Sequence, residues 1–411
     1  MALTVDTGIV NANTGSATTT ITVTAQGKAI ILFTTGQTAE GSDSAANAMF
    51  SFGFSDGTFH RCIAWASDDN VGTTNCGSTW RATAAIEVLS NGTPTSLVTA
   101  TVAFTNATTT TLTFSGTPAA AYKIGYIQFG GSDITNVLVS GATLVSGSTA
   151  DVVVSSPGFQ PDFAMFIGTQ ATAAGTITRA LGTVGFASHV DKEFTMAWGI
   201  DDGANMTANI DAVSYTNSAA SMSQITAGAE TVDFLANLKS FDANGFTLAV
   251  TNAASAAWQF GYLVIKGGQW DVGTTTPVSG GTRTISGMTF QPKGLFLAHT
   301  TADADATVDI NATSGVGAAS STSTEASAAA RQQDAQLNTN VFRDTQSANI
   351  QTQPSGTAST SFDGFTSDGW AITSGGLETP TWQTGWFAMG DNAAAPTSSG
   401  AGWWGSGQFG F

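Results

Sequence analysis

Short sequence blocks recur in the same order along this chain, and an internal repeat restricts the fold more than any single motif does. The clearest block closes each unit and appears as Gly125-Tyr-Ile-Gln-Phe-Gly-Gly131, Gly261-Tyr-Leu-Val-Ile-Lys-Gly-Gly268 and Gly385-Trp-Phe-Ala-Met-Gly-Asp391. Its recurrence predicts three tandem, diverged copies of one unit of about 130 residues.

Other blocks support the same alignment. Phe159-Gln-Pro-Asp returns as Phe290-Gln-Pro-Lys, and the stretch from Ala25 to Phe33 takes the equivalent place in the first unit. Phe52-Gly-Phe aligns with Val184-Gly-Phe, each followed by an Ala-Trp pair. The Gly-Gly pairs predict boundaries near 132 and 269, and therefore units at 1–132, 133–269 and 270–391.

Each repeated block reads as a β-strand. Ile21–Thr24, Thr111–Phe114 and Thr247–Val250 alternate apolar and polar residues, as half-exposed strands do. The run from Lys28 to Phe33 suits a fully buried strand, and Gly, Asn, Asp and Ser clusters separate the runs. Charged residues, which commonly fill exposed helix faces, make up only 10% of the chain. We therefore expect an all-β protein of three antiparallel β-sandwiches, jelly-roll-like in character.

Two segments depart from the repeat. Residues 301–345 lack the expected blocks and are rich in Ser and Ala from Ser320 to Arg331, so we expect an irregular insertion, as a short helix, an ordered loop or a disordered stretch. Residues 392–411 read as a linker and an aromatic tail. The tail is predicted to dock on its own third unit or on a neighbouring subunit through four aromatic residues, Trp403, Trp404, Phe409 and Phe411.

The charge balance excludes two classes of partner. A formal net charge of −17 argues against nucleic acid and against anionic membrane surfaces. No apolar run is long enough for a transmembrane helix, and the first residues do not resemble a secretory signal. We therefore expect no membrane insertion.

Candidate catalytic and metal-binding residues are sparse. The three histidines, His60, His189 and His299, occupy different places in the repeat, so no nucleophile–base pair is predicted and the chain is not expected to be an enzyme. Two acidic pairs, Asp68-Asp69 and Asp201-Asp202, occupy equivalent places and are turn residues or calcium ligands. The acidic set Asp303, Asp305 and Asp309 is either a solvated acidic loop or a second calcium candidate. No other cofactor is predicted.

The two cysteines leave two alternatives open. Cys62 and Cys76 lie in one segment of the first unit without the ligand set of a zinc site or the spacing of a redox pair. We expect a disulfide that closes the loop between them, with two buried thiols as the alternative.

These features together resemble the virion surface proteins of tailed bacteriophages, such as tail fibres, receptor-binding proteins and head decorations. The resemblance is carried by the Met1-Ala-Leu-Thr start, the tandem Phe-Gln-Pro and Gly-Tyr blocks and the neutral polar composition. It implies a non-enzymatic role on the virion surface, with other copies of the chain, other virion subunits and a host-surface glycan as partners. The alternative is a bacterial cell-surface adhesin, surface-layer protein or carbohydrate-binding protein.

Overall fold

The computed structural model confirms the all-β prediction. It describes residues 2–40, 47–68, 76–90, 94–201, 211–226, 230–276, 278, 280–302, 304–332, 342–347, 351–352, 359–375 and 383–392. These residues form strands β1 to β32 and no helix. No helix that could span a membrane was therefore found among them.

The first unit consists of ten strands in two antiparallel sheets. One sheet has the order β1-β10-β3-β4-β5-β6, and the other has the order β2-β9-β8-β7. The strands are β1 (Leu3–Asn11), β2 (Thr18–Thr22), β3 (Gly27–Thr34), β4 (Asn47–Ser55), β5 (His60–Asp68), β6 (Cys76–Arg81), β7 (Ile86–Leu89), β8 (Ser96–Asn106), β9 (Thr109–Phe114) and β10 (Lys123–Gly131).

The second unit repeats this strand order. Its sheets run β11-β21-β13-β15-β16-β17 and β12-β20-β19-β18. Its strands are β11 (Ile134–Thr143), β12 (Val152–Val154), β13 (Phe163–Gly168), β14 (Gly175–Ile177), β15 (Ala180–His189), β16 (Lys192–Asp201), β17 (Asp211–Asn217), β18 (Met222–Thr226), β19 (Thr231–Asp242), β20 (Gly245–Asn252) and β21 (Gln259–Gly267).

The third unit has the same arrangement, with sheets β22-β32-β24-β26-β27-β28 and β23-β31-β30-β29. Its strands are β22 (Gln269–Thr275), β23 (Thr282–Ile285), β24 (Gly294–His299), β25 (Val308–Ile310), β26 (Ala312–Ser321), β27 (Thr324–Gln332), β28 (Phe342–Gln346), β29 (Gln351–Thr352), β30 (Ser359–Thr366), β31 (Gly369–Gly375) and β32 (Thr384–Gly390). The boundaries expected near 132 and 269 lie beside the β10–β11 and β21–β22 connections.

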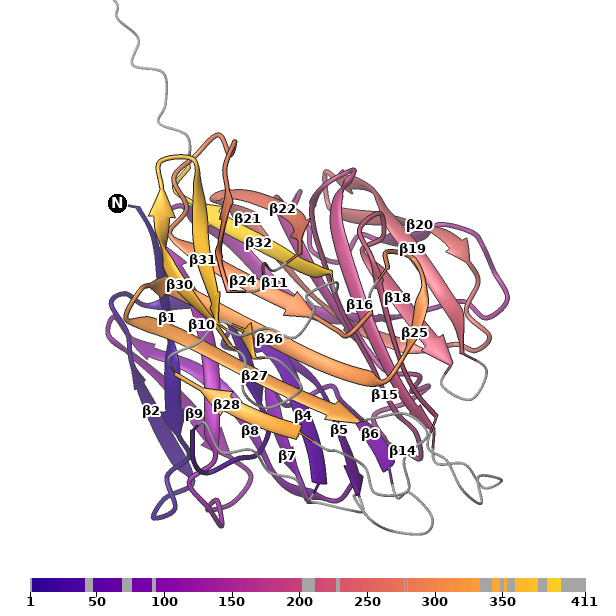
Figure 1. Ribbon diagram of the computed structural model, residues 1–411, viewed down its shortest axis with the longest axis horizontal. Coiled ribbons are helices and arrows are strands. Elements are labelled where there is room, and N and C mark those ends of the chain that lie inside the picture. The colour runs from indigo at the N-terminus through magenta and orange to yellow at the C-terminus, as the bar shows by residue number, and fades with distance from the viewer. Residues whose placement is uncertain are drawn as a thin grey trace, which may run out of the picture.

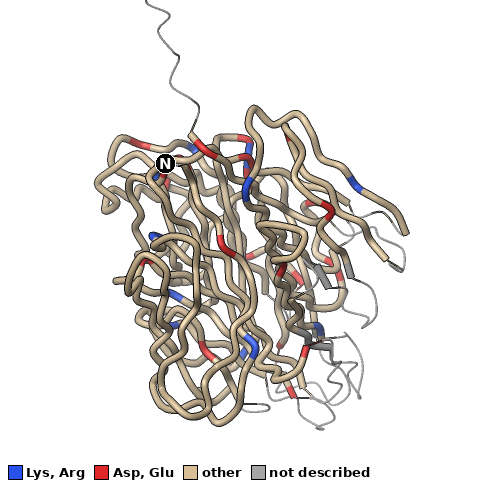
Figure 2. The backbone as a smooth tube through the Cα atoms, turned by 90° about the vertical axis from the view of Figure 1, so that its left-hand side faces the viewer, with Lys and Arg blue, Asp and Glu red and all other residues tan. Residues whose placement is uncertain are grey.

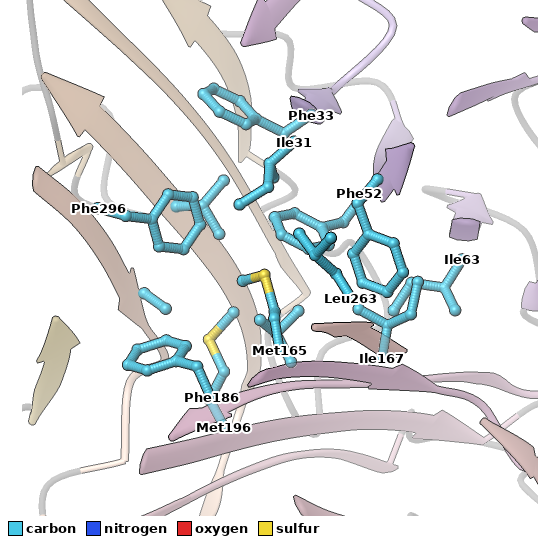
Figure 3. Packing of buried hydrophobic residues seen from close by; sticks show 14 of the residues in the cluster. Ile31, Phe33, Phe52, Ile63, Met165, Ile167, Phe186, Met196, Leu263 and Phe296 are labelled. Carbon is cyan, nitrogen blue, oxygen red and sulfur yellow. The ribbon is translucent and has the colours of Figure 1, made fainter. Parts of the chain in front are cut away.

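The six-stranded sheets are buried on both faces. In β3, Ile30 and Leu32 point into the first unit's own sandwich core, whereas Ile31 and Phe33 point the other way. Because side chains alternate along a strand, a continuous apolar run serves two cores at once. The outward-facing side chains of all three units meet in one shared core, where Ile31, Met165 and Phe296 lie together (Figure 3).

The three units close into a ring around this shared core. β5 of the first unit packs against β11 and β15, and β16 of the second unit packs against the equivalent β22 and β26. β27 of the third unit packs in the same way against β1 and β4, so the third unit meets the first (Figure 1). The backbone N–H of Thr35 donates to Thr345 Oγ1 at 3.2 Å across this last contact. The recurrence of one contact pattern defines an approximate threefold arrangement.

Two short strands cross between units. β14 of the second unit pairs with β6 of the first, and β25 of the third unit pairs with β17 of the second. Each one covers the outer edge of its neighbour's six-stranded sheet. The units are therefore joined by backbone pairing as well as by apolar packing, and are not independent domains.

The irregular insertion predicted at residues 301–345 is wrong for the part that the structure describes. β26 and β27 form a regular antiparallel hairpin that occupies the place of β4–β5 and β15–β16. Its small residues suit a tight central position: Ala318, Ala326 and Ala328 belong to the shared core. A side chain at Gly315 would come within 2.1 Å of the His299 ring. Packing space, and not local propensity, selects alanine and glycine in these strands.

Charged residues are scattered thinly over the backbone, and tan residues predominate in Figure 2.

Candidate functional site

One position of the repeat lies at each of the three junctions between units, and its residue is lysine in two units and aspartate in the third. Lys28, Asp162 and Lys293 are equivalent, because the residues that follow them pair with equivalent residues of β10, β21 and β32. Lys28 Nζ donates to the carbonyl oxygen of Ile134 in the next unit. Lys293 Nζ likewise donates to the carbonyl oxygen of Leu3, at 3.3 Å. A lysine thus bridges the joint in two of the three cases.

Asp162 takes the place of the lysine at the joint between the second and third units. Its Oδ2 accepts the backbone N–H of Gly267, at 2.6 Å, within its own unit. A pocket of about 560 Å³ opens here, which we call the joint pocket. It is lined by Gln160, Pro161, Asp162, Ser188, His189, Val190, Ser240, Phe241, Gly268, Gln269, Trp270, Thr289 and Phe290.

A fixed indole forms part of the pocket wall. The Trp270 ring stacks on Phe163 with centroids 4.3 Å apart and meets Phe129 edge-on at 5.8 Å. Its Nε1–H donates to the carbonyl oxygen of Gly267 at 2.8 Å. Because ring contacts and a hydrogen bond hold the indole, it presents a preformed surface to the pocket, beside Phe241 and Phe290.

The polar lining is rich in hydrogen-bond acceptors. Gln160 Nε2 donates to the carbonyl oxygen of Phe241 at 2.8 Å. Gln269 Nε2 donates to the carbonyl oxygen of Asp391 at 2.6 Å. Each amide therefore retains an acceptor oxygen. His189 Nδ1 donates to the carbonyl oxygen of Val190 at 2.7 Å, so in this tautomer Nε2 can accept a hydrogen bond. The Asp162 carboxylate adds a charged acceptor.

A smaller cavity of about 220 Å³ lies between the first and second units. Arg61, Trp80 and Gln259 line it, and Trp80 Nε1 donates to Gln259 Oε1 at 2.8 Å. The guanidinium of Arg61 donates to the carbonyl oxygen of His60 at 2.7 Å. This cavity is less than half the size of the joint pocket.

The acidic candidates do not form a metal centre in the part of the chain that the structure describes, where no group of three His, Cys, Asp or Glu side chains converges. Asp201 Oδ1 pairs with Arg179 Nε at 3.2 Å, and Asp68 ends β5. Asp305 accepts from the backbone of Ser218 at 2.8 Å. Asp69, Asp202 and Asp303 lie outside the described residues.

The predicted disulfide is wrong: Cys62 and Cys76 are both buried and form no disulfide, which is the alternative of two buried thiols. Cys62 lies opposite Arg81 in the β5–β6 hairpin, whereas Cys76 lies opposite Ser67. The two are thus five positions apart along the hairpin, or about 16 Å, well beyond bonding reach. Burial raises the pKa of the Cys62 thiol well above its usual value, which makes this thiol unreactive in the folded chain.

The histidines also lie apart. His60 Nδ1 lies 2.7 Å from Ser55 Oγ, and burial lowers the His60 pKa. His299 lies in the interior near Gly315, whereas His189 is exposed at the end of β15. The tail residues Trp403, Trp404, Phe409 and Phe411 fall outside the described residues.

Two buried carboxyls were not anticipated from the sequence. Glu193 and Glu325 hold equivalent hairpin positions, opposite Ala187 and Ala319. Glu193 Oε2 accepts the backbone N–H of Leu238 at 2.7 Å, and Glu325 Oε2 accepts that of Phe362 at 3.1 Å. Burial raises the pKa of each carboxyl to about 7. They join the two sheets of a sandwich and are not among the residues that line the joint pocket.

The joint pocket itself was also missed. The available signal was the change from Gln-Pro-Lys to Gln-Pro-Asp in an otherwise matching block. Comparison of the chain with protein-family models and with curated proteins finds no match.

Proposed function

We propose that this chain is a non-enzymatic structural and binding protein on the surface of a phage particle, in a tail-fibre, receptor-binding or decoration role. The observation that carries the proposal is the closed ring, in which three sandwiches share one apolar core. Such a body buries the apolar faces of its three units within one chain. That property suits a protein that works outside the cell.

The surface chemistry supports the same proposal. The chain is acidic and carries few charged residues for its length. Its exposed positions include many short polar side chains, such as the threonines of β2 and β9. The joint pocket adds a place for a ligand. Partners in this proposal are other copies of the chain, other virion subunits and a host-surface glycan.

Mass spectrometry of purified phage particles from the source tests the location. We expect peptides of this chain in density-purified particles, and antibody labelling at the tail or capsid surface. Peptides confined to the bacterial envelope would replace the proposal with the adhesin or surface-layer alternative.

A separate assay tests the absence of catalysis. Incubation with host-surface polysaccharides should release no reducing ends, because a glycosidase needs two suitably spaced carboxyls and Asp162 is the only acidic residue among the described residues lining the joint pocket. Turnover that disappears in Asp162→Asn would overturn the non-enzymatic assignment.

A further inference from the structure

We propose that the joint pocket binds one neutral sugar residue of a glycan, with one such site in each chain. The inference deepens the proposed function and rests on it only for the biological source of the glycan. Sugar binding by the purified chain does not depend on where the protein is displayed.

The size of the pocket fits a sugar residue with room for its linked neighbours. Ligand sites in proteins commonly measure roughly 300 to 1,000 Å³. At about 560 Å³ the joint pocket lies within that range. Two units contribute to its lining, so a ligand contacts both.

The aromatic lining suits the apolar C–H faces of a pyranose ring. Trp270, Phe241 and Phe290 line the pocket, and the indole N–H of Trp270 is already donated to Gly267. Trp270 therefore offers its ring surface to a ligand. Its packing on Phe163 fixes that surface before binding, which reduces the ordering cost on association.

The polar lining selects a ligand with many donors and no negative charge. The acceptors are the Asp162 carboxylate, the two glutamine amide oxygens and His189 Nε2. Sugar hydroxyls donate to such groups. Among the described residues that line the pocket there is no Lys or Arg. With a net charge of −17 on the chain, an acidic sugar would be repelled.

The residue at the position shared by Lys28, Asp162 and Lys293 explains why we expect a sugar site at one joint and not at all three. Lysines at positions 28 and 293 reach across the other two joints to the next unit. Asp162 instead accepts a hydrogen bond from Gly267 of its own unit and does not reach the next unit in this way. Replacing Asp162 by lysine should therefore restore the bridge and fill the pocket.

The test is a titration of the full chain followed by saturation-transfer NMR. The probes are glucose, galactose, mannose and the two N-acetylhexosamines, with glucuronate as the acidic comparison. We expect at least one neutral sugar to bind, glucuronate not to bind, and Asp162→Lys to weaken binding by about tenfold or more. That factor corresponds to losing one charge-assisted hydrogen bond.

Two further variants separate a local loss of sugar binding from a loss caused by unfolding. His189→Ala removes an exposed lining side chain and should weaken binding several-fold with an unchanged melting temperature. The matched control, Ser323→Ala, changes the tip of the equivalent β26–β27 hairpin away from the pocket and should leave binding unchanged. The site assignment is overturned if a sugar binds equally well to both pocket variants. The ligand class is overturned if no neutral sugar binds, or if glucuronate binds best.

Discussion

Single buried carboxyls couple the stability of this protein to pH. Glu193 and Glu325 are 4% and 5% exposed, and each accepts a backbone N–H from the opposite sheet. Burial outweighs those hydrogen bonds and raises both pKa values from 4.5 to about 7. A group with a raised folded-state pKa stabilises the fold below its unfolded pKa, and this contribution is lost as the pH rises through the folded value.

We therefore expect the free energy of unfolding to fall between pH 4.5 and pH 7, by roughly 2 to 3 kcal/mol for each carboxyl. Urea denaturation at several pH values measures this change. The double variant Glu193→Gln, Glu325→Gln keeps an acceptor oxygen but cannot ionise, so its curve should be flatter. Asp151→Asn, which removes a half-exposed ion pair with Lys239, is the control and should retain the slope. An equal slope in the double variant would contradict the assignment.

Residue-level prediction from sequence failed where the register of a hairpin decided the outcome. Cys62 and Cys76 are close in sequence, which favoured a disulfide, but the pairing of Ser67 with Cys76 sets them at opposite ends of β5 and β6. The sequence shows that Asp162 stands where the equivalent positions have Lys28 and Lys293. Only the ring shows that this position faces a joint.

At the scale of elements, short strands that cross between units protect sheet edges. β14 pairs with Ser78–Trp80 of β6, and the carbonyl oxygen of Thr178, the residue after β14, lies 3.9 Å from the buried Sγ of Cys76. Ile177 of β14 packs against the shared core, and Ser78 Oγ of β6 donates to the Arg179 carbonyl at 2.8 Å. Exposed strand edges invite pairing with other chains, so these crossings also limit aggregation.

The thiols report on whether β14 stays in place. In the native, unreduced protein neither cysteine should react with Ellman's reagent, and both should react in denaturant. Ile177→Asp places a charge against the shared core, so β14 should open and the reaction of Cys76 should quicken by roughly tenfold or more. Cys62 lies in β5 on the opposite face of the sheet, toward the first unit's own core, and should stay protected. Peptide mapping after alkylation separates the two.

The matched control is Ile310→Asp, the same substitution in β25, which pairs with β17 and not with β6. Ile310 is 55% exposed, so the protein should tolerate the charge and Cys76 should stay unreactive. Equal labelling of Cys76 in both variants would show that β14 does not shield it.

Element prediction succeeded where the pattern reflected burial and failed where it reflected propensity. Alternating segments such as Thr111–Phe114 are strands because one face meets a core. The Ser- and Ala-rich stretch of the third unit suggested a helix or a loop, because alanine favours helices. It is the β26–β27 hairpin, since the crowded centre admits only small side chains.

For the whole molecule, the repeated blocks predicted the all-β class but not the closure of the ring. Tandem sandwiches could equally extend as a string. The signal for closure lies in the continuous apolar runs of β3, β13 and β24, because a two-layer sandwich buries only one face of each strand. A third apolar layer was needed, and the three units supply it to each other.

The shared core predicts that the three units unfold together. Phe296 of the third unit lies 6.0 Å from Phe52 of the first, 6.4 Å from Phe186 of the second and 4.9 Å from Phe387 of its own unit, between ring centroids. Loss of one unit would expose the apolar faces of the other two. Differential scanning calorimetry should therefore show one transition, with equal calorimetric and van't Hoff enthalpies.

Two truncations of buried phenylalanines sharpen this prediction. Phe296→Ala opens a cavity in the shared core, and Phe246→Ala opens one in the second unit's own core, where Phe166 and Tyr262 surround the ring. Each should destabilise the chain by about 3 to 5 kcal/mol. If the units are coupled, each variant moves the whole transition to lower temperature without splitting it. A transition that splits, with only a third of the heat shifted in Phe296→Ala, would mean that the units unfold independently despite their common core.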